Sequence, residues 1–277
     1  MRLWRIALQI LCVLVLALLL WPIVYALWMS FTPGEMLQPP KAEWSLRWYR
    51  AFFKQSQWTD GLQHSLTVGM MASALSVICG TSASVAVVRH RFRGRRLFQG
   101  AVLLPLFIPA LVLGMALLPM MRTIGLWGTQ LSIASAHSLW GLPLVFLAVR
   151  NALEDVDANT ESAARGLGAS VTQTFLFVTL PIIAPAVAVG ALMAFIISLN
   201  ELVMALFLCT PMIETLPKVI WPNLRYTLSP LVAAASGIGL AATVLLLAGA
   251  WGLLRRRESE TKHMTSALNG IQKHLPT

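Results

Sequence analysis

The sequence has few charged side chains. Asp, Glu, Lys and Arg make up 12% of its 277 residues, whereas hydrophobic residues make up 57%. A soluble domain normally carries about 25% charged residues. The net charge of +10 does not point to a nucleic-acid partner, because Lys and Arg are separated by long apolar runs instead of forming one basic segment. The composition predicts a protein that lies largely in a lipid bilayer.

Cysteine and several functional motifs are scarce or missing too. Cys12, Cys79 and Cys209 lie in or beside apolar segments, without CxxC spacing, so we expect small core residues and no metal site. The sequence has no G-x-x-x-x-G-K-[ST] motif, and this chain therefore cannot by itself cradle nucleotide phosphates. We see no cluster of His, Asp and Glu that would suggest an enzyme. A secondary transporter is the alternative from another class, but the sequence lacks an inverted repeat and several intramembrane carboxylates.

Six apolar segments are long enough to span a membrane as helices of about 20 residues. The first is too long for the apolar core of a signal peptide, and we interpret it as an uncleaved membrane helix. The sequence therefore predicts an all-α polytopic membrane protein with six transmembrane helices. The segments cover residues 6–29, 63–88, 100–120, 131–149, 180–208 and 231–254.

Lys and Arg are distributed unevenly between the two sides of these segments. With the N-terminus inside, 14 of the 21 Lys and Arg residues fall in the tails and even-numbered loops. Cytoplasmic loops carry the excess of positive charge, so we expect both termini in the cytoplasm. We divide the chain into a first membrane helix with an external amphipathic loop (1–62), a five-helix core (63–255) and a polar cytoplasmic tail (256–277).

Two further patterns concern packing. Aromatic residues of the external loop, at helical spacing, predict a stretch that lies along the membrane surface or serves as a docking surface for a soluble partner. Gly, Ala and Ser are dense in the second and sixth apolar segments. Small residues let helices approach closely, so these two segments should be packed inside a bundle.

The loop between the fourth and fifth segments, residues 150–181, carries the most information. Its middle part reads NTESAARGLGASVTQTFLF. Asn159 or Thr160 can cap a helix whose first turn holds Glu161, and the glycines that follow weaken that helix. We expect a short helix, a break, and a second segment that leads into the fifth span.

This loop resembles the EAA loop of ABC importer permeases, in which Glu-Ala-Ala is followed by three residues, Gly, nine residues, Ile, one residue and Leu-Pro. Here nine residues separate Gly168 from Val178, and Leu180-Pro181 follows one residue later. Counting back from Gly168 puts Ser162 on the Glu position, with Glu161 one residue early. The resemblance implies the type I ABC importer permease fold and an ATPase-coupling loop. The coupling residues it implies are Glu161, Ser162, Ala163, Ala164, Gly168, Leu180 and Pro181.

Motifs outside the loop resemble the spermidine/putrescine permease branch, and its C-type subunit in particular. They are HSL from His64, RFRG from Arg91, SLNE ending at Glu201 and ETLP from Glu214. The resemblance implies a bacterial inner-membrane importer subunit for polyamines or a related small amine-containing solute. Branches for 2-aminoethylphosphonate, opines and iron share parts of these motifs and stay open as alternatives.

The same resemblance implies several partners. ATP hydrolysis would take place on a cytoplasmic ABC ATPase dimer, which would bind ATP and Mg²⁺. This chain is therefore expected to be a non-catalytic transport subunit without a cofactor of its own. A second homologous permease subunit, a periplasmic substrate-binding protein and membrane lipid are the other implied partners.

Glu201, beside Asn200 near the external end of the fifth segment, is the ionisable residue that stands out. A carboxylate at membrane depth is costly unless it faces water, a partner or a cation. A polyamine is a cation, so Asn200 and Glu201 are candidate residues of the substrate pathway. The alternatives for Glu201 are a contact with the partner permease and a place at the headgroup level. His64 and His137 lie near segment ends, where we expect interfacial hydrogen bonds.

Overall fold

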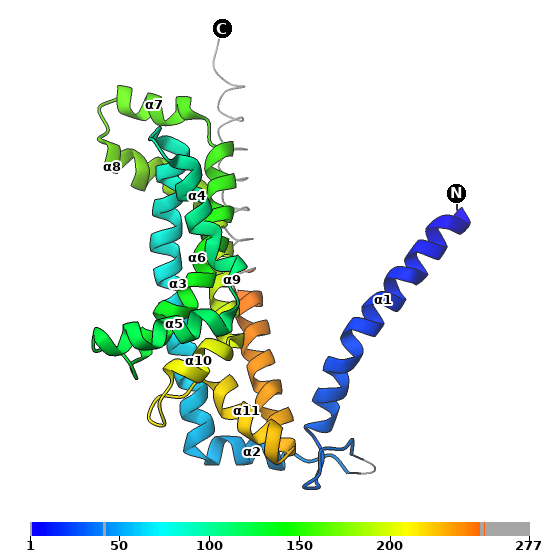
Figure 1. Ribbon diagram of the computed structural model, residues 1–277. Coiled ribbons are helices and arrows are strands. Elements are labelled where there is room, and N and C mark those ends of the chain that lie inside the picture. The colour runs from blue at the N-terminus through cyan, green and yellow to red at the C-terminus, as the bar shows by residue number, and fades with distance from the viewer. Residues whose placement is uncertain (1, 41–42, 250–251, 253–277) are drawn as a thin grey trace. The chain divides into compact units, whose positions relative to one another are not determined.

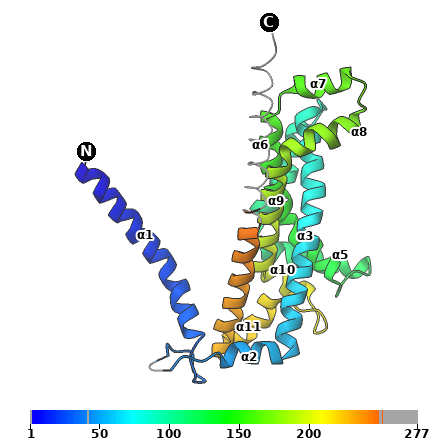
Figure 2. The same ribbon diagram turned by 180° about the vertical axis from the view of Figure 1, so that it is seen from behind.

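The computed structural model describes residues 2–40, 43–249 and 252, and these residues form helices joined by loops (Figures 1 and 2). No β-strand is formed within this part of the chain. The all-α prediction is confirmed. The expected polar tail, 256–277, lies outside the described residues. The chain divides into two compact units.

The first unit comprises Met1–His64 and Glu214–Ala242. The sequence-based division placed residues 214–242 with the five-helix core, whereas the structure groups them with the N-terminal part. Two aromatic side chains of the expected amphipathic loop, Phe52 and Trp58, are buried and contribute to the core of this unit. The unit contains α1 (Arg2–Met29), α2 (Arg47–Lys54), the start of α3 (Ser56–Arg89), α11 (Leu216–Tyr226) and most of a helix over Pro230–Gly249.

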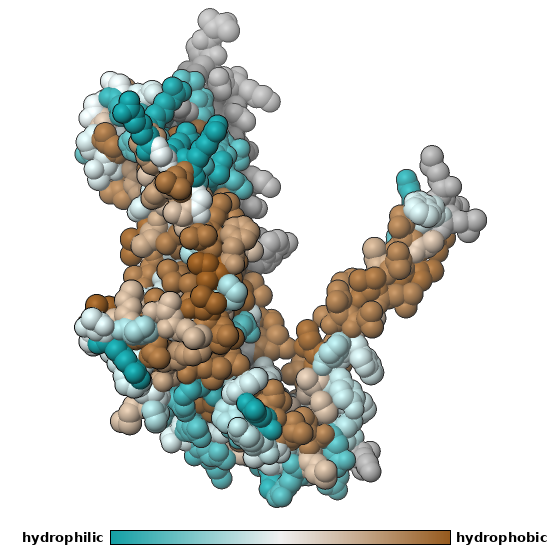
Figure 3. All heavy atoms as spheres, viewed as in Figure 1, coloured by the Kyte–Doolittle hydropathy of each residue, from teal (hydrophilic) through white to brown (hydrophobic). Residues whose placement is uncertain are grey.

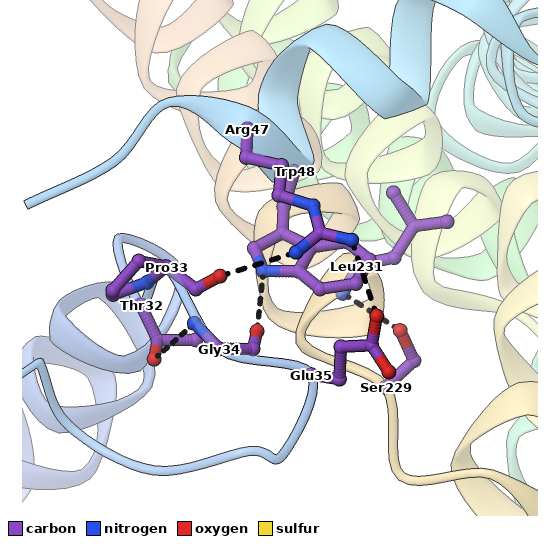
Figure 4. A network of polar contacts seen from close by, with 8 residues as sticks. All are labelled: Thr32, Pro33, Gly34, Glu35, Arg47, Trp48, Ser229 and Leu231. Carbon is purple, nitrogen blue, oxygen red and sulfur yellow. Dashed lines mark hydrogen bonds and ion pairs between the residues drawn. The ribbon is translucent and has the colours of Figure 1, made fainter.

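Polar contacts hold the loop after α1 against α2 (Figure 4). Arg47 donates to the carbonyl oxygen of Pro33 at 3.3 Å and contacts Oε1 of Glu35 at 3.3 Å. The indole Nε1 of Trp48 donates to the carbonyl oxygen of Gly34 at 3.1 Å. Because Arg47 and Glu35 are both exposed, the ion pair adds little stability, and the contacts mainly fix the path of the loop.

The apolar surface of α1 is exposed along the helix (Figure 3). A helix of this kind is stable only where lipid or another apolar partner surrounds it, and α1 is long enough to cross a bilayer. Cys12 on α1 and Cys79 on α3 are exposed, whereas Cys209 is buried. The expectation of core cysteines is therefore correct only for Cys209.

The second unit comprises Ser65–Ile213 and Thr243–Thr277. In it α6 packs extensively on α9, and α10 packs on α5 and α6. Between α6 and α9 the core is aliphatic, with Val145, Val149 and Ile183 fully buried. The complete helices of this unit are α4 (Arg95–Leu103), η1 (Leu104–Phe107), α5 (Ala110–Thr123), α6 (Gln130–Asp155), α7 (Ala158–Gly166), α8 (Val171–Thr174), the π-helical turn η2 (Phe175–Thr179), α9 (Leu180–Asn200) and α10 (Val203–Leu208).

Five described helices are long and apolar enough to span a membrane, and a bent pair makes a sixth candidate. The bend lies in the segment predicted as one span over 100–120, where the axes of Arg95–Phe107 and Ala110–Thr123 differ by 105°. Pro109 explains the break, because proline lacks a backbone N–H and disfavours helical backbone at Ile108, which is extended. The fifth predicted segment, 180–208, is also interrupted, since α9 ends at Asn200.

Small residues let α3, α6 and α9 approach one another, as expected for the second apolar segment. A Cβ atom added at Gly80 of α3 would lie 2.9 Å from Cβ of Val145. One added at Gly141 of α6 would lie 2.7 Å from Cβ of Ala194 and would also clash with Ser76. Gly141 therefore marks a place where all three helices are in close contact.

We predict that Gly141→Val destabilises the protein. Overpacking of a close contact costs about 1 to 3 kcal/mol, because neighbouring helices must shift. Thermal unfolding in detergent should show a melting temperature several degrees below wild type. Gly100→Val is the matched control, because no described atom lies within 4 Å of a Cβ added there. Equal melting temperatures for the two variants would contradict this packing.

Candidate functional site: the loop over 157–181 and the helix break at Glu201

The loop helix α7 begins at a cap that the sequence analysis missed. Oδ1 of Asp157 accepts a hydrogen bond from the backbone N–H of Asn159 at 2.9 Å, and Asp157 has extended backbone angles. The prediction of Asn159 or Thr160 as the cap is wrong, because α7 starts at the residue after Asp157. A carboxylate in that position suits the partial positive charge of a helix N-terminus.

The structure has the predicted short helix and break, and the second segment that was predicted to lead into the fifth span is helical. Gly168 follows α7 with a φ of +96°, a backbone conformation that other residues adopt only with strain. Ser170 then opens α8 with a capping box. Its hydroxyl accepts from the backbone N–H of Gln173 at 3.2 Å, and Oε1 of Gln173 accepts from the N–H of Ser170 at 2.8 Å. Through η2 the chain continues into α9.

Glu161 of α7 is turned into the protein. Its Oε1 accepts a hydrogen bond from Nε of Arg89 at 3.1 Å and lies 3.0 Å from Nη2 of the same guanidinium. The hydroxyl of Thr179 donates to the same oxygen at 2.8 Å. Arg89 is the last residue of α3 and Thr179 the last of η2, so this carboxylate joins three elements. No sequence signal pointed to Arg89 or Thr179 as its partners.

The outer face of the loop is exposed and partly apolar. Of the expected coupling residues, Ser162, Ala163, Gly168 and Pro181 are exposed, while Ala164 and Leu180 are half-buried. Leu167 is 90% exposed, and Val171 and Phe177 are exposed as well. In Figures 1 and 2, α7 and α8 lie together at one end of the second unit. Val171 and Phe177 belong to the helical stretch Val171–Asn200, which is long and apolar enough to span a membrane, so Leu167 is the large apolar side chain that the loop itself exposes.

The carboxylate of Glu201 lies at the break between α9 and α10 and is 5% exposed. Its two oxygens accept from the backbone N–H of Met204 at 3.0 and 2.9 Å, and Oε2 accepts from Ala205 at 3.2 Å. These amides have no partner in the preceding turn, because α10 starts only at Val203. Glu201 therefore supplies the acceptors that the first turn of α10 needs.

His137 of α6 completes this buried group. Its Nε2 lies 3.3 Å from Oε2 of Glu201, and its Nδ1 is 2.8 Å from Oγ of Ser198. The group links α6, α9 and α10. The expectation of an interfacial His137 is wrong, since the side chain is fully buried. His64, in the first unit, is half-buried, with Nδ1 at 3.2 Å from the carbonyl oxygen of Glu214.

The two candidate pathway residues differ in exposure. Asn200 is exposed, and its Nδ2 donates to the carbonyl oxygen of Ile196 at 2.8 Å. Glu201 is held within its own chain by the contacts described above. Asn200 is thus the accessible member of the pair within this chain, and Glu201 is the buried one.

Comparison with known proteins defines the class. The family described as "Binding-protein-dependent transport system inner membrane component" matches residues 72–259. The chain belongs to this family, and it is a multi-pass permease subunit of an ABC importer. Subunits of this kind are non-catalytic. The fold predicted from the resemblance is confirmed by a solved ABC transporter involved in the import of the acidic polysaccharide alginate, with a TM-score of 0.71, 17% identity and coverage of 92% of this chain and 96% of the other.

Several relatives transport polyamines. The putrescine transport system permease protein PotI of Escherichia coli K12 is 33% identical over 227 residues, which cover 79% of this chain and 80% of PotI. The spermidine/putrescine permease protein PotC of the same organism is 28% identical, over 73% of this chain and 76% of PotC. The trehalose permease protein SugB of Mycobacterium tuberculosis is 31% identical over 58% of each chain. The resemblance to the spermidine/putrescine permease branch is confirmed.

We predict that Glu201→Gln lowers the stability of the protein. The amide keeps one acceptor oxygen, so backbone N–H groups at the start of α10 and the ring of His137 lose part of their pairing. A buried polar group left unsatisfied costs about 1 to 3 kcal/mol. The melting temperature in detergent should fall by several degrees. Glu154→Gln is the control, because its ion pair with Arg150 is exposed. If both variants melted like wild type, the capping role would be refuted.

Proposed function

We propose that this chain is the transmembrane permease of an ATP-driven importer for polyamines such as putrescine and spermidine. The observation that carries the proposal is the match to PotI and PotC over about three quarters or more of each chain. SugB matches a smaller share, so trehalose is the less favoured substrate. Both termini lie in the cytoplasm in this proposal, as the distribution of Lys and Arg favours.

The importer contains other chains. A cytoplasmic ATPase dimer binds ATP and Mg²⁺, because this sequence has no motif for nucleotide phosphates. A second, homologous permease completes the pathway across the membrane. A periplasmic binding protein delivers the solute, and a solved alginate transporter of the same fold was captured with its solute-bound periplasmic protein.

The exposed face of α7 and the turn at Gly168 form the contact with the ATPase. Leu167, Ala163 and Ser162 offer apolar and small side chains that a cleft on the ATPase can cover. When the ATPase dimer closes on ATP, the loop moves with it. The membrane helices then pass between inward-facing and outward-facing states, an equilibrium that ATP and the loaded binding protein both shift.

Asn200 and Glu201 mark the pathway of the solute. The exposed amide of Asn200 can accept a hydrogen bond from an ammonium group. Glu201 is close behind it, and a buried carboxylate acts on a cation more strongly than one in water, because the dielectric constant is lower. In this proposal Glu201 has two roles, as the acceptor for α10 and as the charge that favours cationic solutes.

The coupling proposal predicts that Gly168→Asp abolishes transport while the permease stays folded. No described atom lies within 4 Å of a Cβ added at Gly168, so the side chain has room within this chain. It strains the backbone at φ +96° and obstructs the ATPase. The assay is ATP-driven uptake of labelled putrescine into vesicles that hold the whole importer, where we expect less than about a tenth of the wild-type rate, the loss that about 1.4 kcal/mol produces.

Gly94→Asp is the matched control. Gly94 also has a positive φ, +85°, and open space around an added Cβ among the described residues, but it lies outside the loop. It should transport like wild type. Unlabelled spermidine should compete with putrescine, and trehalose should not. Normal uptake by Gly168→Asp would refute the coupling role, and competition by trehalose alone would refute the polyamine assignment.

A further inference from the structure

Glu161 lies on a different side of α7 from Ser162, the residue at the Glu position of the EAA-like motif. It precedes by one residue the position at which the motif has its Glu, and each residue of an α-helix turns about 100° around the axis. Ser162, which occupies that position, is exposed, whereas Glu161 is buried. The carboxylate therefore does not share the outer face of α7.

On its inner side α7 is held by polar contacts of the Glu161 carboxylate. Glu161 accepts from Arg89 at 3.1 Å and from Thr179 at 2.8 Å, and the guanidinium of Arg89 also reaches the carbonyl oxygen of Val156 at 3.5 Å. Arg89 ends α3, and Thr179 directly precedes α9. The three side chains, called the three-way tie below, join the loop helix to two membrane helices.

The Arg89–Glu161 ion pair can be compared with a second ion pair of the same protein, Arg150–Glu154. The Arg89–Glu161 pair has side-chain exposures of 21% and 10%, and it links residues 72 positions apart. The Arg150–Glu154 pair has exposures of 30% and 44% and links neighbouring turns of one helix. Burial strengthens a charge-assisted hydrogen bond, and removal of one partner leaves an uncompensated charge. The first pair therefore constrains the structure more than the second.

The contact between Glu161 and Arg89 matters because the backbone at both ends of α7 is not helical. Before α7 the chain is extended at Val156 and Asp157, and after it Gly168 has a positive φ. Each end is thus a break at which α7 can change its direction without bending another helix. Without the three-way tie, a movement imposed on the outer face of α7 would be absorbed at these breaks.

We propose that Glu161 is a positioning residue for transport, and that the three-way tie carries the movement of α7 to α3 and α9. The proposal rests on the proposed function of the loop as the contact with the ATPase. It adds that Glu161 acts inside this chain, through Arg89 and Thr179, and not as a contact with the ATPase. Loss of the tie should uncouple ATP hydrolysis from uptake and leave docking of the ATPase intact.

The test compares Glu161→Ala, Arg89→Ala and the double variant in vesicles that contain the complete importer. Arg150→Ala with Glu154→Ala is the matched control pair. Three quantities are measured for each: the melting temperature, ATP hydrolysis stimulated by the loaded binding protein, and labelled putrescine taken up per ATP hydrolysed. The double variant separates stability from coupling, because it leaves no buried charge unpaired.

We expect both single variants to melt below wild type and the double variant to recover most of that loss. Uptake per ATP should fall at least tenfold in all three, while the control pair keeps the wild-type ratio. Recovery of uptake per ATP in the double variant would overturn the proposal, since the contacts would then serve stability alone. An unchanged ratio in the single variants would overturn it too.

The wild-type chain in the same vesicles distinguishes this proposal from the proposed function. Absence of ATP-driven putrescine uptake by the wild-type chain would count against the function and, with it, against the three-way tie. Uptake by the wild-type chain together with normal ratios in the variants would overturn the tie only. Loss of ATPase binding in Glu161→Ala would show that Glu161 contacts the ATPase directly, which also contradicts the proposal.

Discussion

A buried carboxylate needs hydrogen-bond donors or a positive charge beside it, and this constraint explains the surroundings of Glu161 and Glu201. Among the described residues these are the buried carboxylates; Glu201 lies at the break between α9 and α10, and Glu161 lies within α7, between the breaks at its two ends. Glu201 accepts from the free amides at the start of α10, and Glu161 holds α7 to the ends of α3 and η2. The free amides at the start of α10 therefore find acceptors within the chain. Both carboxylates also belong to the regions on which the proposed function depends.

In the proposed function, the two buried carboxylates belong to regions with different requirements. A pathway for a solute needs a polar break within apolar helices, and the proposal assigns this role to the exposed Asn200 and the capped α10. A coupling loop needs an outer face that another protein can bind. It also needs an inner face that stays fixed to the membrane helices. In α7 these faces are one residue apart, with Ser162 outside and Glu161 inside. The close packing at Gly141 then connects α3, α6 and α9 as one unit.

Much of this architecture could be predicted from the sequence. Apolar length identified the membrane segments, and the spacing from Gly168 to Leu180-Pro181 identified the loop and the family. The bend at Pro109 was missed because hydropathy alone does not register a missing N–H within an apolar run. The partners of Glu161 and Glu201 were missed for another reason. Arg89 is 72 positions from Glu161, and His137 is buried beside Glu201 through the packing of α6, so only the fold brings them together.

The most direct test of this account is a photo-cross-linking probe at Leu167, which is 90% exposed on the outer face of the loop. In cells that express the whole importer, the account predicts an adduct between this chain and an ATPase that carries the G-x-x-x-x-G-K-[ST] motif. A probe at Met212, which is 85% exposed and lies on the side predicted to be external, should give no adduct with that ATPase. An ATPase adduct from Met212 and none from Leu167 would contradict both the coupling face and the orientation of the chain.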